Sequence, residues 1–345
     1  MSGLIINGRF LERKITGVER YGREIVRCLP GPVKMLRPPA GMKAWRGHLW
    51  EQVVLPSLVR DMLLWSPANT GPALARNQIV TIHDTNAIEH PEWYRTGAAA
   101  WYRILLPILA RQARRVLTVS QFSRQRLIAA FKLAPEKVIV IYPGVDRRQF
   151  HPVSLFEQAE YRQRSGLNRP YLLFVGSPGR GKNLGRLAQA WRQVSPGFPD
   201  VDLVIAGRSG GISKKEDLAA IAGRLKLLGS PAESDLAALY SGALALVFPS
   251  PSEGFGLPAL EAMACGLPVV AANSGALPEV VRDAGMLVDP FDVACLAESM
   301  CRVVCDSRLR KELRQRGLER SEQFSWERAA QLIYQEAAGL GIPEG

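Results

Sequence analysis

Cysteine pairs, long apolar runs and a leader-like start are all missing from this sequence. The longest uncharged apolar stretches, such as Ile104–Ala110, are far too short to cross a bilayer as a helix. Residues 1–10 lack the charged-then-apolar order of a secretory signal. The five cysteines form no Cys-x-x-Cys pair, and an odd number without a framework is typical of buried thiols in a reducing compartment. These absences predict a cytoplasmic protein.

Acidic residues are scarce in the first half of the chain. Residues 1–165 hold 25 Lys and Arg against 12 Asp and Glu, whereas residues 166–345 hold 19 against 20. The net charge of +12 therefore belongs to the first half, which predicts an anionic partner there: a lipid surface, a phosphorylated acceptor or nucleic acid. Because no recognised nucleic-acid motif accompanies the charge, we expect no nucleic-acid partner. A solvated basic face is the plainer alternative.

Apolar runs that end in small or polar residues alternate with helical patterns along the chain. Such runs are typical of parallel strands that helices bury on both faces. This alternation of apolar runs and helical patterns begins again near Tyr171, and a length of 345 residues suits two domains. We therefore predict an α/β fold of two doubly wound Rossmann-like domains, residues 1–163 and 164–324, followed by a segment at 325–345. The predicted strands are Leu4–Asn7, Ile79–Ile82, Val116–Val119, Val138–Tyr142, Tyr171–Val175, Leu203–Ala206, Leu244–Phe248 and Val269–Ala271.

The segment from residue 249 to 268 places two acids around a glycine loop. Glu253 precedes Gly254-Phe255-Gly256-Leu257, and Glu261 lies one turn into a helix that Pro258 is expected to begin. The loop offers backbone N–H groups directly before the positive end of that helix, a combination that binds anions. Carboxylates suit sugar hydroxyls and amides suit phosphates, so the segment predicts a site for a nucleoside diphosphate sugar. A tight glycine loop with a helix-capping glutamate is the alternative interpretation.

This segment resembles the donor-binding signature of the family-4 retaining glycosyltransferases of the GT-B fold. Within that family the chain looks closest to bacterial mannosyltransferases or related hexosyltransferases. Residues 275–290 resemble the same family. The resemblance implies an acceptor domain and a donor domain that face a central cleft, with the segment 325–345 as a closing helix that packs back on the first domain. It also implies that Glu253 contacts the donor sugar, that Glu261 binds the ribose, and that the amides of Gly254, Phe255, Gly256 and Leu257 hold the diphosphate.

The loop after the strand at 171–175 supplies basic residues. It reads Gly176, four residues, then Gly181-Lys182, which is nearly a P-loop, but Asn183 lacks the hydroxyl that would bind magnesium. A P-loop nucleotidase therefore remains a remote alternative. The stretch also resembles the family's Gly–Arg–Lys–Asn segment. That resemblance implies that Arg180 and Lys182 neutralise the donor diphosphate and the charge that grows on the leaving group.

Three further residues complete the predicted site. Gly17 matches the family's N-terminal glycine loop, which the resemblance places near the donor phosphate and sugar. His83 matches the histidine that touches the donor sugar near the reacting carbon, and we interpret it as a positioning hydrogen-bond partner rather than a general base. A structural histidine at a strand end is the alternative. We also expect Gly207, which follows the predicted strand at 203–206, to bind the donor.

We expect no metal and no cofactor. Asp200-Val201-Asp202 has the Asp-x-Asp spacing of metal-dependent transferases of another fold, but it stands before a strand and not after one, so we interpret it as a solvated turn. Arg180 and Lys182 can supply the positive charge instead. No carboxylate stands out as the nucleophile of a double displacement.

Aromatic and basic residues are interleaved in two segments of the first half, Met42–Trp65 and Trp101–Val116. The first contains Trp45, Trp50 and Trp65. Such segments can lie at a lipid interface or form core helices with one wet face. With the basic excess, we favour peripheral binding to an anionic inner leaflet of the plasma membrane.

The combined interpretation is a metal-independent, retaining hexosyltransferase. It would move mannose from GDP-mannose to a saccharide or lipid-linked acceptor in surface polysaccharide or lipopolysaccharide synthesis. A UDP-sugar donor is the alternative. A non-catalytic membrane scaffold of GT-B type and a P-loop nucleotidase are two remote alternatives.

Overall fold

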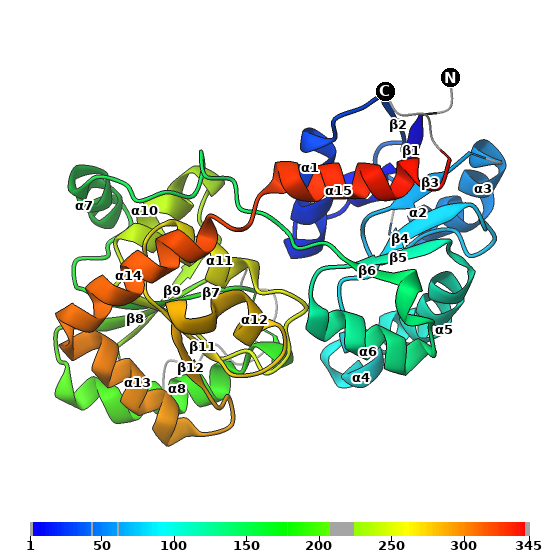
Figure 1. Ribbon diagram of the computed structural model, residues 1–345. Coiled ribbons are helices and arrows are strands. Elements are labelled where there is room, and N and C mark those ends of the chain that lie inside the picture. Colours follow the sequence, from blue (N-terminus) through cyan, green and yellow to red (C-terminus); the bar gives the residue numbers. More distant parts are fainter. Residues whose placement is uncertain (1–2, 43, 61, 178, 208–223, 342–345) are drawn as a thin grey trace. The chain divides into compact units, whose positions relative to one another are not determined.

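The computed structural model describes residues 3–42, 44–60, 62–177, 179–207 and 224–341, and these form two compact units (Figure 1). The first unit comprises Met1–Gly144 and Ser325–Gly345, and the second comprises Val145–Phe324. Each unit is built on one six-stranded sheet, and all the pairings of described strands are parallel. The predicted fold of two doubly wound α/β domains is confirmed.

The first sheet has the strand order β2-β1-β3-β4-β5-β6. Its central strands are short and apolar, and every residue of β1 and β4 is buried, because helices cover both faces. The chain first winds from β1 to β2 and then reverses past β1 to β3, so the switch point of this sheet lies between β1 and β3. The bounds are β1 (Leu4–Asn7), β2 (Val33–Leu36), β3 (Leu64–Ser66), β4 (Gln78–Thr81), β5 (Arg115–Thr118) and β6 (Val138–Val140).

Polar caps begin several helices of the first unit. The hydroxyl of Ser120 accepts a hydrogen bond from the backbone N–H of Ser123 at 2.9 Å, and Ser325 caps the last helix in the same way. Figure 1 shows that last helix, α15, beside α1, and the two are in contact. The bounds are α1 (Gly17–Cys28), α2 (Ala44–Leu49), α3 (Leu55–Val59), α4 (Asn86–Glu89), α5 (Thr96–Gln112), α6 (Gln121–Phe131) and α15 (Trp326–Ala338).

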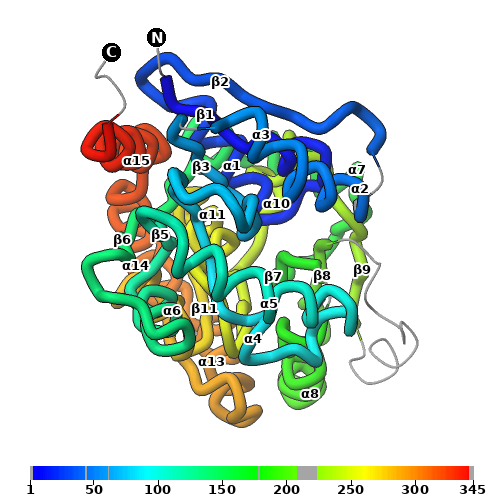
Figure 2. The backbone as a smooth tube through the Cα atoms, turned by 90° about the vertical axis from the view of Figure 1, so that its right-hand side faces the viewer, coloured from blue at the N-terminus to red at the C-terminus, as the bar shows by residue number. Residues whose placement is uncertain are grey.

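The second sheet has the strand order β12-β11-β10-β7-β8-β9. The chain winds outward from β7 through β8 to β9, a run that can be followed in Figure 2, and then reverses to β10 on the other side of β7. The switch point of this sheet therefore lies between β7 and β10. The bounds are β7 (Tyr171–Val175), β8 (Asp202–Ala206), β9 (Leu225–Gly229), β10 (Ala245–Phe248), β11 (Val269–Ala272) and β12 (Met286–Val288).

The second unit begins earlier than the predicted boundary after residue 163. Residues 155–164 form a helix, α7, which begins with a capping box made by the hydroxyl of Ser154 and the carboxylate of Glu157. Tyr161 of α7 is buried, and α7 packs against α10 of the same unit. The bounds are α7 (Leu155–Arg164), α8 (Leu184–Val194), α10 (Leu236–Ser241), α11 (Leu257–Ala264), α12 (Leu277–Val281), α13 (Val293–Cys305) and α14 (Ser307–Ser321).

The two switch points determine where ligands can reach the backbone. In open parallel sheets, the loops that leave the carboxyl ends of the strands separate at the switch point and open a crevice for a ligand. Within each unit, the loops after β1 and β3, and those after β7 and β10, occupy that position. Across the described ranges, no helix is long and apolar enough to cross a membrane.

Candidate active site

Lys182 and Glu253 meet at the switch point of the second sheet. Lys182 ends η5 (Arg180–Lys182), a short 3₁₀ turn after β7, and Glu253 lies in the loop after β10. Nζ of Lys182 lies 2.5 Å from Oε1 of Glu253 and 5.5 Å from the centre of the Phe248 ring. Both side chains keep part of their surface exposed, 30 % for Lys182 and 14 % for Glu253. The structure thus brings together the two residues that the family resemblance links to the diphosphate and to the sugar.

Asn183 joins three loops at this edge of the sheet. Its Nδ2 donates hydrogen bonds to the carbonyl oxygen of Pro249 at 3.0 Å, after β10, and to that of Pro290 at 2.6 Å, after β12. Its backbone has a φ of 57°, which lies in the left-handed region that asparagine tolerates better than most residues. In the sequence, Asn183 argues against a P-loop and forms part of the Gly–Arg–Lys–Asn resemblance, and neither feature predicts this role. The bonded side chain fixes Lys182, its neighbour, relative to the loop that carries Glu253.

The glycine loop turns into α11 as predicted. α11 begins at Leu257 with Pro258 in its first turn, and Gly256 precedes it with a φ of 97°. A Cβ at Gly256 would lie 2.5 Å from a methyl carbon of Leu277, so a side chain is excluded there by space as well as by conformation. The Phe255 side chain is buried and packs edge-on against Phe324. A ligand would therefore meet the backbone of this loop, at the positive end of α11.

Glu261 lies one turn into α11, as predicted, and it is buried. Its Oε2 accepts a hydrogen bond from the hydroxyl of Tyr240 at 2.8 Å. Tyr240 comes from α10, and no recognisable sequence motif surrounds it. A buried carboxylate that is held by a hydroxyl donor is oriented for further hydrogen bonds, as a ribose diol would require.

Gly207 and Arg180 differ in how tightly they are held. A Cβ at Gly207 would lie 1.9 Å from the carbonyl oxygen of Gly176, so only glycine lets the loops after β7 and β8 approach this closely. Arg180 is exposed, and among the described residues it forms no ion pair. The structure therefore supports a local packing reason for Gly207 and does not bring Arg180 to the Lys182–Glu253 pair. Pro178 of the same loop lies outside the described residues.

In the first unit, His83 follows β4 and is buried beside Tyr21 of α1. The two rings meet edge to face with their centres 4.7 Å apart, and Nε2 of His83 lies 3.0 Å from the carbonyl oxygen of Pro67. Burial lowers the pKa of His83 to about 4, although the Pro67 carbonyl and Glu19 act in the opposite direction. His83 is therefore neutral near pH 7.

Gly17 opens α1 at an exposed position. The residue before it, Thr16, donates its backbone N–H to Oε2 of Glu19 at 3.1 Å, and Glu19 also pairs with Arg13 at 3.2 Å. The first turn of α1 is thus held by its own capping box. The structure places Gly17 at a helix N-terminus.

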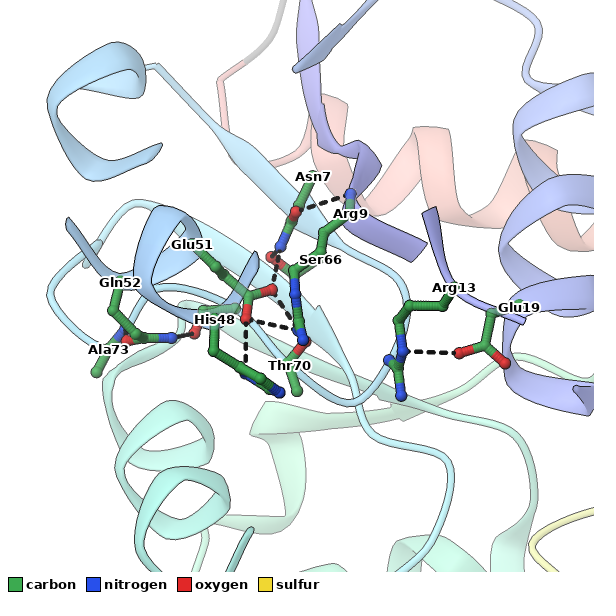
Figure 3. A network of polar contacts seen from close by, with 11 residues as sticks. Asn7, Arg9, Arg13, Glu19, His48, Glu51, Gln52, Ser66, Thr70 and Ala73 are labelled. Carbon is green, nitrogen blue, oxygen red and sulfur yellow. Dashed lines mark hydrogen bonds and ion pairs between the residues drawn. The ribbon is translucent and has the colours of Figure 1, made fainter. Parts of the chain in front are cut away.

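A buried polar network lies after β1 and β3, at the switch point of the first sheet (Figure 3). Glu51 is fully buried, on the π-helical turn η2 (Trp50–Val54), and its carboxylate accepts hydrogen bonds from Asn7 (2.7 Å), Arg9 (3.0 Å) and Thr70 (2.9 Å). No motif in the sequence predicts this network. The one available signal was a charged residue, Glu51, inside an otherwise apolar segment. Removing one partner of such a buried pair costs about 3–5 kcal/mol, so the network ties these loops together.

Two expectations about other residues need correction. Asp202 is not in a solvated turn: it is the first residue of β8, it is buried, and its carboxylate pairs with Lys226 at 3.2 Å. It lies at the amino end of its strand, away from the edge that carries Lys182. Trp50 and Trp65 are buried in the first unit, so of the three tryptophans in that segment only Trp45 can contact a lipid surface. Within the described ranges, no group of three or more His, Cys, Asp and Glu is placed to hold a metal.

Comparison with known proteins identifies two family models that together match most of the chain. The model of the family "Glycosyl transferases group 1" matches residues 157–320, and that of "Glycosyltransferase Family 4" matches residues 22–149. The chain is 31 % identical to the O-antigen chain mannosyltransferase B of Escherichia coli over 78 % of its own length and 72 % of that protein. It is 36 % identical to a D-inositol 3-phosphate glycosyltransferase of Salinispora arenicola, over 68 % of this chain and 57 % of that protein.

Solved structures show the same fold. Anabaena HepE, crystallised in complex with UDP and glucose, superposes with a TM-score of 0.76 at 21 % identity, covering 97 % of this chain and 99 % of HepE. At that identity the likeness concerns the fold alone.

Proposed function

Because this chain belongs to the family-4 glycosyltransferases of the GT-B fold, we propose that it transfers a hexose from a nucleoside diphosphate sugar to a saccharide or lipid-linked acceptor. The proposed donor is GDP-mannose, since the E. coli relative is a mannosyltransferase, and the proposed setting is surface polysaccharide or lipopolysaccharide synthesis. A UDP-sugar is the alternative donor, since HepE binds UDP. The proposed stereochemical outcome is retention.

The observation that carries the proposal is the Lys182–Glu253 pair beside the N-terminus of α11. In the proposed complex, Nζ of Lys182 turns from Glu253 to a diphosphate oxygen, and the backbone N–H groups of residues 254–257 bind the other oxygens. Glu253, released from the lysine, accepts hydrogen bonds from hydroxyls of the sugar. Glu261 accepts those of the ribose.

These groups would act most strongly when the bond to the sugar breaks. Negative charge then grows on the diphosphate, and preorganised donors aimed at that charge are usually the largest contribution to catalysis. Lys182 and the N-terminus of α11 supply positive charge without a metal ion. We therefore propose metal-independent transfer, with Arg180 as a further cation at the diphosphate.

The geometry of Asn183 disfavours the P-loop nucleotidase alternative. Its side-chain amide already donates to Pro249 and Pro290, and an amide nitrogen is not a magnesium ligand. A P-loop has a serine or threonine at this position, and this chain has Asn183 there, which carries no hydroxyl.

The run of α2, η2 and α3 supplies a surface for the proposed peripheral association with an anionic membrane. Trp45, Leu49 and Val53 recur at four-residue intervals and are 62 %, 55 % and 61 % exposed, and Val54 and Leu58 extend the same exposed set. Arg46 is exposed and lies over the Trp45 ring at 5.3 Å. An apolar helix face with basic neighbours is the usual device for in-plane binding at a lipid interface.

A ligand screen followed by a transfer assay tests the proposed function. Because a ligand that binds only the folded state raises its melting temperature, GDP and GDP-mannose should raise it more than UDP, ADP and their sugars do. Transfer from the stabilising donor should proceed unchanged in excess EDTA. Stabilisation by no nucleoside diphosphate would contradict the proposed function, and transfer that EDTA abolishes would contradict metal independence.

A further inference from the structure

Directed contacts hold both the backbone and the ring of His83. Its backbone N–H donates to Oδ1 of Asn69 at 2.7 Å, and its carbonyl oxygen accepts a hydrogen bond from the hydroxyl of Ser123 at 2.8 Å. Its ring contacts Tyr21 edge to face, and Nε2 lies 3.0 Å from the Pro67 carbonyl oxygen. The two ring contacts, with Tyr21 and with the Pro67 carbonyl, fix the orientation of the imidazole, whereas the Asn69 and Ser123 bonds hold its backbone. A side chain whose remaining polar atom must be aimed at a ligand needs such a fixed ring.

The contact with Pro67 determines which ring nitrogen carries the proton. A carbonyl oxygen can only accept a hydrogen bond, so Nε2 must be the donor. Since burial keeps the ring neutral near pH 7, there is one ring proton, and Nδ1 is left with its lone pair. Among the residues that the structure describes, Nδ1 has no hydrogen-bond partner. His83 therefore presents an acceptor and not a donor.

Asn69 holds the loop that makes this contact. It has a φ of 62°, its backbone N–H donates to the carbonyl oxygen of Thr81 at 3.1 Å, and its Oδ1 accepts from the backbone of His83. Both bonds attach residues 67–70, which follow β3, to the end of β4. Pro67 lies two residues before Asn69, so the position of its carbonyl oxygen relative to the imidazole depends on these two bonds.

We propose that Asn69 is a positioning residue: by holding the Pro67 carbonyl oxygen against Nε2, it keeps His83 in the tautomer whose Nδ1 accepts a hydrogen bond from a sugar hydroxyl of the donor. The sugar part of this inference rests on the proposed function. The tautomer part does not. In the opposite tautomer, Nδ1–H would donate, and the hydroxyl would have to reverse its own proton.

The tautomer can be measured directly by nitrogen NMR of the imidazole rings in the intact protein. The chain has only four histidines, so the signals of His83 can be assigned by its substitution. The wild type should show a protonated Nε2 at pH 7. Asn69→Gly keeps the left-handed backbone available and removes the Oδ1 acceptor, so it should show a mixture of tautomers. Ser123→Ala is the matched control, because it removes a buried hydrogen bond to the same residue and leaves the loop at Pro67 intact.

Kinetics test the consequence for transfer. Asn69→Gly should lower kcat about tenfold, equivalent to ~1.4 kcal/mol of transition-state stabilisation, while the KM for the donor changes about twofold or less. Asn69→Asp retains an oxygen acceptor and should recover most of the rate. Ser123→Ala should keep the wild-type tautomer and most of kcat.

Three results would overturn the inference. The first is a wild-type spectrum with the proton on Nδ1. The second is a wild-type tautomer and kcat in a folded Asn69→Gly protein, and the third is equal losses in Asn69→Gly and Ser123→Ala. If the wild type transferred no sugar at all, the proposed function would fail, and the NMR result would still decide the role of Asn69.

Discussion

Nζ of Lys182 lies 2.5 Å from Oε1 of Glu253, and the two residues lie in the loops that follow the paired strands β7 and β10. The contact neutralises both charges at a site that is proposed to bind a dianion. A diphosphate must therefore displace the carboxylate, and the released carboxylate becomes available to the sugar. One ion pair of the free protein thus links binding of the phosphates to placement of the sugar.

Lys182→Ala should weaken binding of the nucleoside diphosphate. A charge-assisted hydrogen bond contributes about 1.5–3 kcal/mol, so the dissociation constant should rise about tenfold to a hundredfold by calorimetry. The unpaired Glu253 would add repulsion. Lys226→Ala is the control. Lys226 also pairs with an acid, Asp202, but it lies on β9, away from the proposed site. An equal loss in both variants would mean that the effect is structural.

Glu261 should act on the ribose and not on the phosphates. The wild type should bind a dideoxynucleoside diphosphate about tenfold more weakly than the ribonucleotide, because the acceptor–hydroxyl bonds are lost. Glu261→Gln should bind the two ligands with similar affinity. Tyr240→Phe, which removes only the hydroxyl that orients Glu261, should give an intermediate difference. A Glu261→Gln variant that still distinguishes the two ligands as the wild type does would assign the ribose elsewhere.

Asn183 should contribute to stability through both its side chain and its backbone. Asn183→Gly removes the bonds to Pro249 and Pro290 and should lower the free energy of unfolding by about 1–3 kcal/mol. Asn183→Ala should cost about 1–2 kcal/mol more, because alanine is strained at a φ of 57°. Urea unfolding of the three proteins separates the contributions. If Asn183→Gly had the same free energy of unfolding as the wild type, the side-chain hydrogen bonds of Asn183 would make no net contribution to stability.

His83 should make the protein less stable as the pH falls from 7 to 5. The pKa of His83 is about 4 in the folded protein against about 6.5 in an unfolded chain, so between these values the unfolded chain binds more protons. Stability is therefore complete above pH 6.5 and is lost as the pH decreases. The loss from this residue should reach about 2 kcal/mol at pH 5.

The variant His83→Gln isolates that contribution. Its amide can still donate to the Pro67 carbonyl oxygen but does not titrate. His48, whose pKa is also lowered to about 4 by burial and by Arg9 and Arg13, remains in both proteins and cancels in the difference. Equal pH dependence of urea unfolding in the wild type and in His83→Gln would show that His83 is not buried neutral.

The double variant Leu49→Glu, Val53→Glu should weaken binding to anionic vesicles. Both positions are exposed, so folding should be retained while about 1–2 kcal/mol of apolar contact is lost, or roughly tenfold in binding to phosphatidylglycerol vesicles. Leu155→Glu, Phe156→Glu is the matched control, since these α7 residues are also exposed and apolar. Co-sedimentation that is unchanged by the first pair, or reduced equally by both, would remove α2, η2 and α3 as the binding surface.

The sequence predicted most of the buried strands but only one of the four described edge strands, β6. The other three edge strands, β2, β9 and β12, are only partly buried, so they lack a continuous apolar run. β3 is central, but it has only three residues. The predicted boundary was late because the apolar rhythm of the second sheet begins at β7, after α7 has already joined the second unit.

The candidate site was predictable where its residues are close in the sequence. Glu253 and Glu261 flank one loop, and their positions before and within α11 follow from Pro258. The network of Arg9 and Glu51 was not predictable, because the partners are 42 residues apart and meet only through the packing of η2 on the first sheet. The fixation of His83 by Asn69 depends likewise on a contact between two neighbouring strand ends.

A crystal structure of the protein with GDP-mannose or with GDP tests the proposed site most directly. A diphosphate oxygen should lie within hydrogen-bonding distance of Nζ of Lys182, the other oxygens should bind the amides before α11, and Glu253 should be separated from the lysine. A complex in which the Lys182–Glu253 pair is intact and the diphosphate is bound elsewhere would contradict the proposed site.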